Sequence, residues 1–239
     1  MKKLLFAISG LFLIYSCTET KKPEGNLHLS VNIKGLQKGT IYIQKVVDTT
    51  LVAIDTITID GKSNFETYLN VTEPEMYYLF LDRGISNSID NNLPFFAEPG
   101  KITIDTNLDK YYANAKITGS KNQELLDTYR KVNARFTDQR LSFTEEKFWA
   151  ERNNKMAKAD SIQKLQDNIL KKKYLYAINF VIQNKDYEVA PFVALTEIPD
   201  IQPKYRDMIQ KAITPKVAKS LYGKKLNDYY NSLKTQETK

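Results

Sequence analysis

The stretch Leu27-His28-Leu29-Ser30-Val31-Asn32-Ile33-Lys34 alternates apolar and polar side chains without interruption. Because successive side chains of a strand point to opposite faces, this period of two predicts a β-strand that is buried on one face. The same period recurs in short segments, separated by turn-forming residues, as far as Thr118. The expected strands are 27–34, 40–47, 51–59, 63–71, 76–81, 93–97, 101–106 and 113–118. Their number and spacing predict an antiparallel β-sandwich-like domain, or an open barrel, over residues 27–118.

Two of these segments predict more than a strand. Met76–Leu81 is apolar on both faces, which is typical of a strand in the centre of a sheet. In Leu51–Ile59 the apolar phase changes between Ile54 and Ile57. A β-bulge near Asp55-Thr56 would cause that change, because a bulge inserts one extra residue into a strand.

The period changes to that of a helix at Gly119-Ser120. Ser120 and Gln123 fit a capping box, in which each side chain satisfies a free backbone amide at the helix start. Further helix signals are a second candidate capping box and two prolines at first helical positions. These residues are Ser142 with Glu145, Pro203 and Pro215.

The helix after the second box would extend to about Gln183, a length that predicts a kink or break. Its apolar stripe consists of Ile162, Leu165, Ile169, Tyr176 and Phe180. We therefore predict a helical region over residues 120–235. The fold class expected for the whole chain is α+β, with the β-sandwich-like domain first.

The amino-terminal segment has the pattern of a bacterial export signal. Two lysines precede an apolar stretch, Leu4–Tyr15, that is shorter than the roughly 20 residues of a membrane-spanning helix. The stretch ends in Ile14-Tyr15-Ser16-Cys17, which resembles the lipobox of lipoproteins. We interpret residues 1–17 as a lipoprotein signal peptide with a retained, lipidated Cys17, and 18–26 as a tether. A secretory leader with a coincidental cysteine is the alternative.

Cys17 is the only cysteine of the chain. Acyl chains on this residue would anchor the protein stably, since each buried methylene contributes about 0.8 kcal/mol. A thiol that carries lipid cannot form a disulfide or act in redox chemistry. No lysine followed by acids comes directly after Cys17, so we expect the protein at the outer membrane, facing the periplasm. Export and a dispersed net charge of +7 argue against nucleic acid as a partner.

Several short motifs occur together in the chain. They are Ile33-Lys34-Gly35-Leu36, Gly39-Thr40-Ile41-Tyr42-Ile43, Asp55-Thr56, Asp60-Gly61 with Phe65, and Thr214–Lys224. Over residues 26–235 these motifs resemble domain-of-unknown-function family 4369, the amino-terminal region of thioredoxin-like envelope lipoproteins. In many members a thioredoxin-like domain with a Cys-x-x-Cys site follows. This chain has no Cys-x-x-Cys, so the resemblance implies a fold and a compartment, and we expect the redox domain to be missing.

One polar loop is the first place to look for a ligand. Asp82, Asp90, Asn91 and Asn92 could surround a calcium ion, and 84–92 is the longest polar connection between strands. The alternating acids and central glycine of a calcium loop are absent from it, however. Clusters of Asp and Asn also form ordinary turns, which is the alternative interpretation.

Other candidate sites lack the partners that their chemistry needs. His28 is the only histidine, and its position on the polar face of a strand predicts an exposed side chain. The carboxylate pairs Glu145 with Glu146 and Asp55 with Asp60 do not converge as glycoside hydrolysis requires. We therefore expect no catalytic residues, no cofactor and no metal.

Two surface features remain. The predicted long helix is basic, which indicates a solvated face or contact with anionic lipid or an acidic partner. Its lysines are Lys155, Lys158, Lys164 and Lys171-Lys172-Lys173. The doublets Tyr77-Tyr78, Tyr111-Tyr112 and Tyr229-Tyr230 could stack on sugars or form an interface, but each should divide between core and surface.

Three functions follow from these patterns. The first is a non-enzymatic binding or scaffold lipoprotein that recognises a protein or peptide. The second is an accessory subunit of a separate thioredoxin-like thiol-disulfide oxidoreductase. The third is a hydrolase with an unrecognised site, which would depend on residues such as Asp82 or Asp90.

Overall fold

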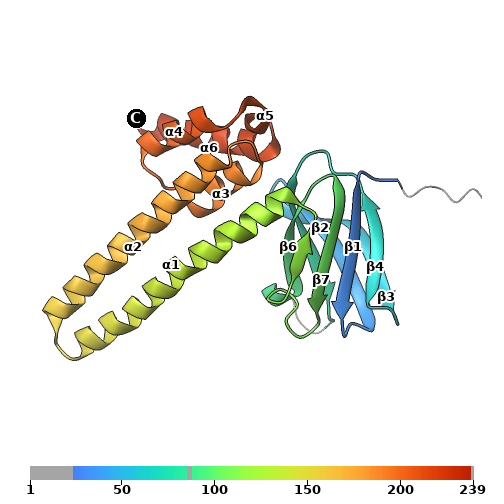
Figure 1. Ribbon diagram of the computed structural model, residues 1–239, viewed down its shortest axis with the longest axis horizontal. Coiled ribbons are helices and arrows are strands. Elements are labelled where there is room, and N and C mark those ends of the chain that lie inside the picture. The colour runs from blue at the N-terminus through green and yellow to red at the C-terminus, as the bar shows by residue number, and fades with distance from the viewer. Residues whose placement is uncertain (1–23, 85–87, 238–239) are drawn as a thin grey trace, which may run out of the picture.

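The computed structural model describes residues 24–84 and 88–237, and these form a β-sandwich followed by helices (Figure 1). The predicted α+β class is confirmed, and a strand lies in every predicted segment, although the segment predicted at 113–118 is a strand only over Lys116–Thr118 because a turn occupies its first residues. The strands are β1 (Leu27–Lys34), β2 (Lys38–Val47), β3 (Thr50–Asp60), β4 (Asn64–Leu69), β5 (Glu75–Asp82), β6 (Asn92–Ala97), β7 (Gly100–Asn107) and β8 (Lys116–Thr118).

The strands form two four-stranded sheets, with the orders β4-β1-β7-β8 and β3-β2-β5-β6. Neighbouring strands pair antiparallel except β1 and β7, which pair parallel in the register Leu27↔Gly100 to Lys34↔Asn107. The alternating apolar residues of β1 are fully buried between the sheets. They join one core with apolar residues of both sheets, such as Ile41, Leu79 and Ile104.

β5 lies between β2 and β6, as its two apolar faces predicted. Tyr77, Leu79 and Leu81 belong to the sandwich core. On the opposite face, Met76 is 4% exposed and belongs to a second core, which the helices provide. The strand therefore needs apolar side chains on both faces because it contributes to two cores.

The predicted bulge in β3 is also present. Ile43 pairs with Asp55, but its neighbour Gln44 pairs with Ala53. Ile54 is therefore the extra residue of β3, directly beside the expected position. The insertion explains why apolar residues change face along this strand.

The helices follow from Lys121 onward, and they were expected from Ser120 to residue 235. They are α1 (Lys121–Arg152), α2 (Met156–Gln183), α3 (Val189–Glu197), α4 (Pro203–Ala212), α5 (Pro215–Ala218) and α6 (Leu221–Glu237). Pro203 and Pro215 occupy first helical positions as predicted. α1 and α2 form a hairpin that projects away from the sandwich, and α3–α6 gather at its base (Figure 1). With 32 residues, α1 is about 48 Å long.

Of the two predicted capping boxes, the first forms only one of its two hydrogen bonds, and the second is absent. The Ser120 hydroxyl accepts a hydrogen bond from the Gln123 amide at 3.0 Å. Ser142 and Glu145 lie inside α1, so the second predicted helix start is wrong. The expected break falls instead at Asn153–Lys155, where Asn154 has a φ of 54°. Asparagine tolerates this left-handed conformation, which ends a helix, better than most residues do.

The helical core lies at the base of the hairpin. Met76 and Phe96 from the sandwich pack there with buried residues of α1, α2, α3 and α6. Toward the hairpin tip, the buried apolar cluster contains only Ala150, Ala159 and Ile162, with Phe143 packed against it. The distal arm is therefore a thin pair of helices.

The predicted signal peptide, Cys17 and tether residues 18–23 lie outside the described residues. Within the described ranges, neither α1 nor α2 nor any shorter helix has the length and apolarity to cross a membrane.

Candidate functional site

The structure brings together only part of the predicted ligand loop. Asp90 and Asn91 line a cavity of about 490 Å³ beside Arg83 and Tyr112. Asp82 is not among the lining residues, and its carboxylate accepts a hydrogen bond from the Gly84 amide at 2.8 Å.

Asn92 begins β6 and pairs with Phe80. In residues 24–84 and 88–237, no group of three His, Cys, Asp or Glu side chains could hold a metal ion. A ligand at this loop stays a prediction.

His28 is less exposed than its place on a polar face predicted. Its side chain is 22% exposed, stacks on Tyr68 at 4.5 Å and lies 3.2 Å from a Glu66 carboxylate oxygen. Tyr68 is its cross-strand partner on β4, which explains the partial burial. The histidine joins two neighbouring strands.

Buried polar side chains join the sandwich to the helices. The side-chain oxygen of Gln123 accepts a hydrogen bond from the backbone amide of Phe96 in β6 at 2.8 Å. Asn122, which is 2% exposed, donates to Glu98 at 2.6 Å and to Glu188 at 3.3 Å. Its own side-chain oxygen accepts from the Val189 amide at 2.8 Å, which ties the start of α3 to the start of α1.

A second set of contacts connects α6 to the start of β5 and to the loop before it. The Met76 amide donates to the Tyr222 hydroxyl at 2.9 Å, and the Leu221 amide donates to the Glu73 carboxylate at 2.7 Å. Glu73, Glu98 and Glu188 also border a cavity of about 550 Å³ at this junction. Each of these carboxylates already accepts a hydrogen bond from α1 or α6, so the junction fixes the orientation of the arm.

The family comparison covers the sandwich and the start of α1, but not the junction residues that α3 and α6 contribute. Residues 27–126 match the model of a domain of unknown function, DUF4369. These residues form a DUF4369 domain. The match extends through the first turn of α1, so the DUF4369 domain includes Asn122 and Gln123, which hold the arm. No curated protein matches the chain.

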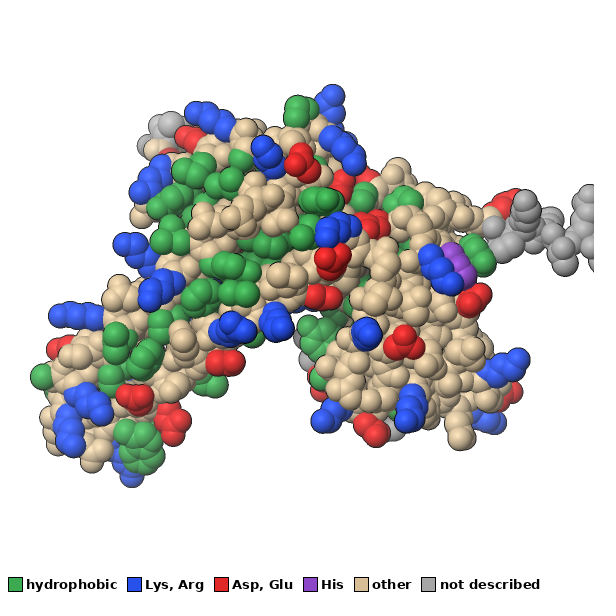
Figure 2. All heavy atoms as spheres, viewed as in Figure 1, with side chains coloured by type: hydrophobic (Ala, Val, Ile, Leu, Met, Phe, Trp, Pro, Cys, Tyr) green, Lys and Arg blue, Asp and Glu red, His purple; other side chains and the backbone are tan. Residues whose placement is uncertain are grey.

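The arm beyond the DUF4369 domain carries large exposed hydrophobic side chains. A contiguous apolar surface on a folded protein is typical of an interaction site, whereas scattered exposed residues are ordinary. The exposed residues of the hairpin are Leu141 (70%), Phe148 (55%), Trp149 (49%), Met156 (56%), Leu165 (45%) and Leu175 (37%). Hydrophobic side chains run along the hairpin in Figure 2, with Lys and Arg at its margins.

Part of this surface is a groove between α1 and α2, which we call the hairpin groove. It has a volume of about 610 Å³, and its lining includes Phe143, Leu165, Ile169, Lys172 and Leu175. The sequence placed Leu165 in the apolar stripe of the long helix, and in the structure it is 45% exposed and lines the groove. A helical apolar stripe shows which residues share a face, and it does not show what covers that face.

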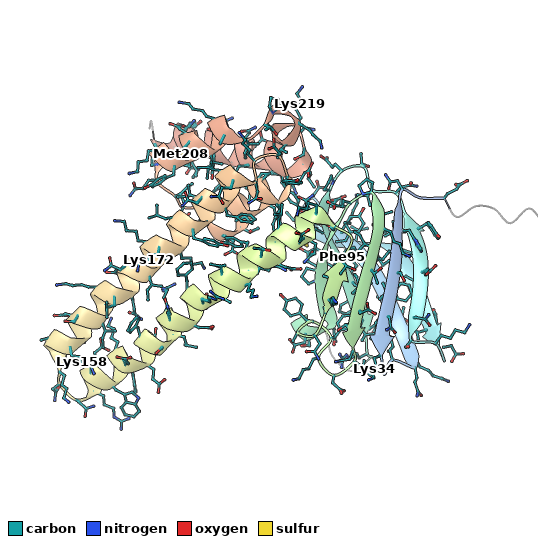
Figure 3. The ribbon with its side chains drawn as sticks, in the orientation of Figure 1. Lys34, Phe95, Lys158, Lys172, Met208 and Lys219 are labelled. Atoms are coloured by element: carbon teal, nitrogen blue, oxygen red, sulfur yellow. The ribbon has the colours of Figure 1, made fainter. Side chains whose placement is uncertain are left out.

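The lysines predicted on the long helix are distributed over the arm. Lys155, Lys158, Lys164, Lys171 and Lys172 are exposed, and Figure 3 shows Lys158 and Lys172 pointing outward from the arm. Lys171 and Lys172 line the hairpin groove. Lys173 differs, because it is half-buried and its ammonium lies 3.9 Å from Glu197.

The tip of the arm carries an aromatic pair. Phe148 and Trp149 meet edge to face at 5.5 Å, and the Arg152 guanidinium lies 5.3 Å from the Trp149 ring centroid. Such combinations of Trp, Phe and Arg are frequent in the energetic centres of protein interfaces. The tip and the hairpin groove are therefore the candidate binding surfaces of this molecule.

Proposed function

We propose that this protein is a non-enzymatic binding or scaffold module of the bacterial envelope that recognises a protein or peptide. The observation that carries the proposal is the projecting α1–α2 arm with its exposed apolar groove and aromatic tip. Exposed Leu, Phe and Trp side chains cost solubility unless a partner covers them. The buried polar junction supports the same role, because it holds the arm in a fixed direction relative to the DUF4369 domain.

In-cell photocrosslinking tests this role. A photoreactive amino acid replaces Phe148 at the tip, Leu175 in the groove or, as control, Leu51 on β3, which is 43% exposed. We expect defined protein adducts from the arm positions and none from the control. Adducts at Leu51 alone, or at no position, would contradict the proposal. Capture of a thioredoxin-like oxidoreductase would change the assignment to an accessory redox subunit.

The proposed envelope location depends on acylation of Cys17, followed by residues 18–26 as the tether. Cys17→Ser removes the atom that would carry the lipid, while it leaves the apolar leader unchanged. We expect the variant to lose labelling by radioactive fatty acid and to change its membrane fractionation. A labelled variant, or an unmodified Cys17 thiol in the mass spectrum of the processed wild type, would show that the anchor is elsewhere or absent.

A further inference from the structure

The distal arm lacks the core that its length requires. α1 and α2 contain 32 and 28 residues, but their distal buried cluster consists of three residues with Phe143 at its edge. Helices in stable bundles usually bury a continuous apolar stripe against two or more neighbours. One further helix packed against the arm would enlarge this thin core.

The two sides of the α1–α2 seam differ in their chemistry. On one side, Lys147 donates to Gln163 at 2.6 Å and Gln166 donates to Thr144 at 2.8 Å. These polar bridges close that side. Since a helix turns about 100° per residue, Leu165 and Lys172 of α2 face the other side of the seam, where the hairpin groove lies.

The spacing of the groove residues suits a helical occupant. Leu165, Ile169, Lys172 and Leu175 follow one another at intervals of four, three and three along α2, and Phe143 faces them from α1. This is the spacing at which an antiparallel or parallel helix meets a neighbouring helix. The rim carries Lys171 and Lys172, and no acidic residue is among the described residues that line the groove.

We propose that the hairpin groove binds one amphipathic helix of a partner protein, with an apolar stripe toward Leu165 and Leu175 and acidic flanks toward Lys171 and Lys172. The proposal rests on the binding function above and names its partner. The apolar residues lie in a concave groove, which a helix fills and which a flat bilayer surface reaches less readily. An isologous pair of arms would bring the lysine rims of two copies together, which like charges disfavour.

The test uses the full-length protein as the cell processes it, held in nanodiscs of zwitterionic lipid. Two labelled synthetic helices of about 21 residues share a leucine stripe and differ only in their flanks, which carry Glu in one and Lys in the other. Fluorescence anisotropy then measures their affinities. We expect the Glu-flanked helix to bind at least about ten-fold more tightly than the Lys-flanked helix.

Variants locate this binding. Leu165→Glu with Leu175→Glu should weaken binding of the Glu-flanked helix by about ten-fold or more. The matched control is Leu51→Glu with Val52→Glu, which introduces the same charges at 43% and 42% exposed sites of β3 and should leave binding unchanged. Lys171→Glu with Lys172→Glu should reverse the preference between the two helices. Circular dichroism checks that every variant keeps its helix content.

Several other results would contradict the proposal that the hairpin groove binds an acidic amphipathic helix. Equal affinity for both helices, or full binding by the Leu165 and Leu175 variant, removes the groove as the site. Self-association that this variant abolishes assigns the groove to a second copy of the chain. Capture of the protein by anionic vesicles, without peptide binding, assigns the surface to a membrane. If crosslinks form at Phe148 and not at Leu175, the binding function stands and the groove proposal fails.

Discussion

Gln123, in the first turn of α1, accepts a hydrogen bond of 2.8 Å from the backbone amide of Phe96 on the edge strand β6. In a local capping box this glutamine would turn back to its own helix start. Instead its side-chain oxygen bonds to the sheet, and its side-chain nitrogen donates to the Asp127 carboxylate at 2.7 Å. The Gln123 side chain therefore satisfies the free Phe96 amide of an edge strand. The same contact fixes where α1, and with it the arm, leaves the sandwich.

Replacing Gln123 by leucine should destabilise the whole fold. Gln123 is 1% exposed, so Gln123→Leu leaves the buried Phe96 amide without this hydrogen-bond acceptor. We expect the free energy of unfolding to fall by about 1–3 kcal/mol. Urea denaturation measures it, and Gln139→Leu, at an exposed position of the same helix, should change it by less than about 0.5 kcal/mol. Equal effects of both variants would show that the sheet contact contributes nothing.

Gly119, between β8 and α1, should not tolerate any side chain. Its φ is +96°, and an added Cβ would lie 1.9 Å from the Lys101 carbonyl oxygen of β7. We expect Gly119→Ala to cost at least about 3 kcal/mol, since it combines backbone strain with a clash. Gly61 has a φ of +85° with no atom within 4 Å of that position. Gly61→Ala should therefore cost only about 1 kcal/mol in the same urea measurement; a similar cost at Gly119 would argue against the close approach.

The sequence predicted the sandwich well because its signal is local. Strict alternation in Leu27–Lys34 and the two apolar faces of Met76–Leu81 follow from strand geometry, and the structure confirms both. The parallel pairing of β1 with β7 was not visible, because it joins segments about 70 residues apart and no local pattern encodes it. The same limit applies to Asn122 with Glu98, which only the folded chain brings together.

The helical arm was predicted less well than the sandwich. Ser142 and Glu145 satisfy the pattern of a helix start, yet α1 continues through them to Arg152. Asn153-Asn154 carried a usable stop signal, since asparagine accommodates a positive φ. The hairpin groove was not predictable, because the periodicity that includes Leu165 does not distinguish a buried face from one that awaits a partner.

Alkaline pH should unfold the protein through its buried tyrosines. Burial raises the pKa of Tyr77 to about 12, with nearby Glu75 adding to the effect. Because the folded-state pKa exceeds the unfolded value of about 10, this tyrosine stabilises the fold fully below pH 10 and loses that contribution as pH rises toward 12. Burial also raises the pKa of Tyr111, Tyr129 and Tyr230.

The raised pKa of Tyr77 corresponds to about 2–3 kcal/mol of stability at most. We expect the free energy of unfolding to decline between pH 10 and 12, and tyrosinate absorbance to appear together with loss of the circular-dichroism signal. Tyr77→Phe should make the decline shallower. Full tyrosine titration in a folded protein at pH 10 would contradict the burial on which this prediction depends.

Trp149 is the only tryptophan, so all tryptophan fluorescence of the protein comes from the tip of the arm. Its side chain is 49% exposed and does not line the hairpin groove. We expect the emission of a water-exposed indole, ready quenching by acrylamide, and little change when the Glu-flanked helix occupies the groove. Trp149→Ala should alter the free energy of unfolding by only about 1 kcal/mol, because about half of the side chain stays exposed in the folded protein. Blue-shifted emission from the protein alone would mean that a second molecule covers the tip. A blue shift on adding anionic vesicles, lost in Phe148→Ser, would mean that the arm meets a bilayer through its end rather than a helix along its side.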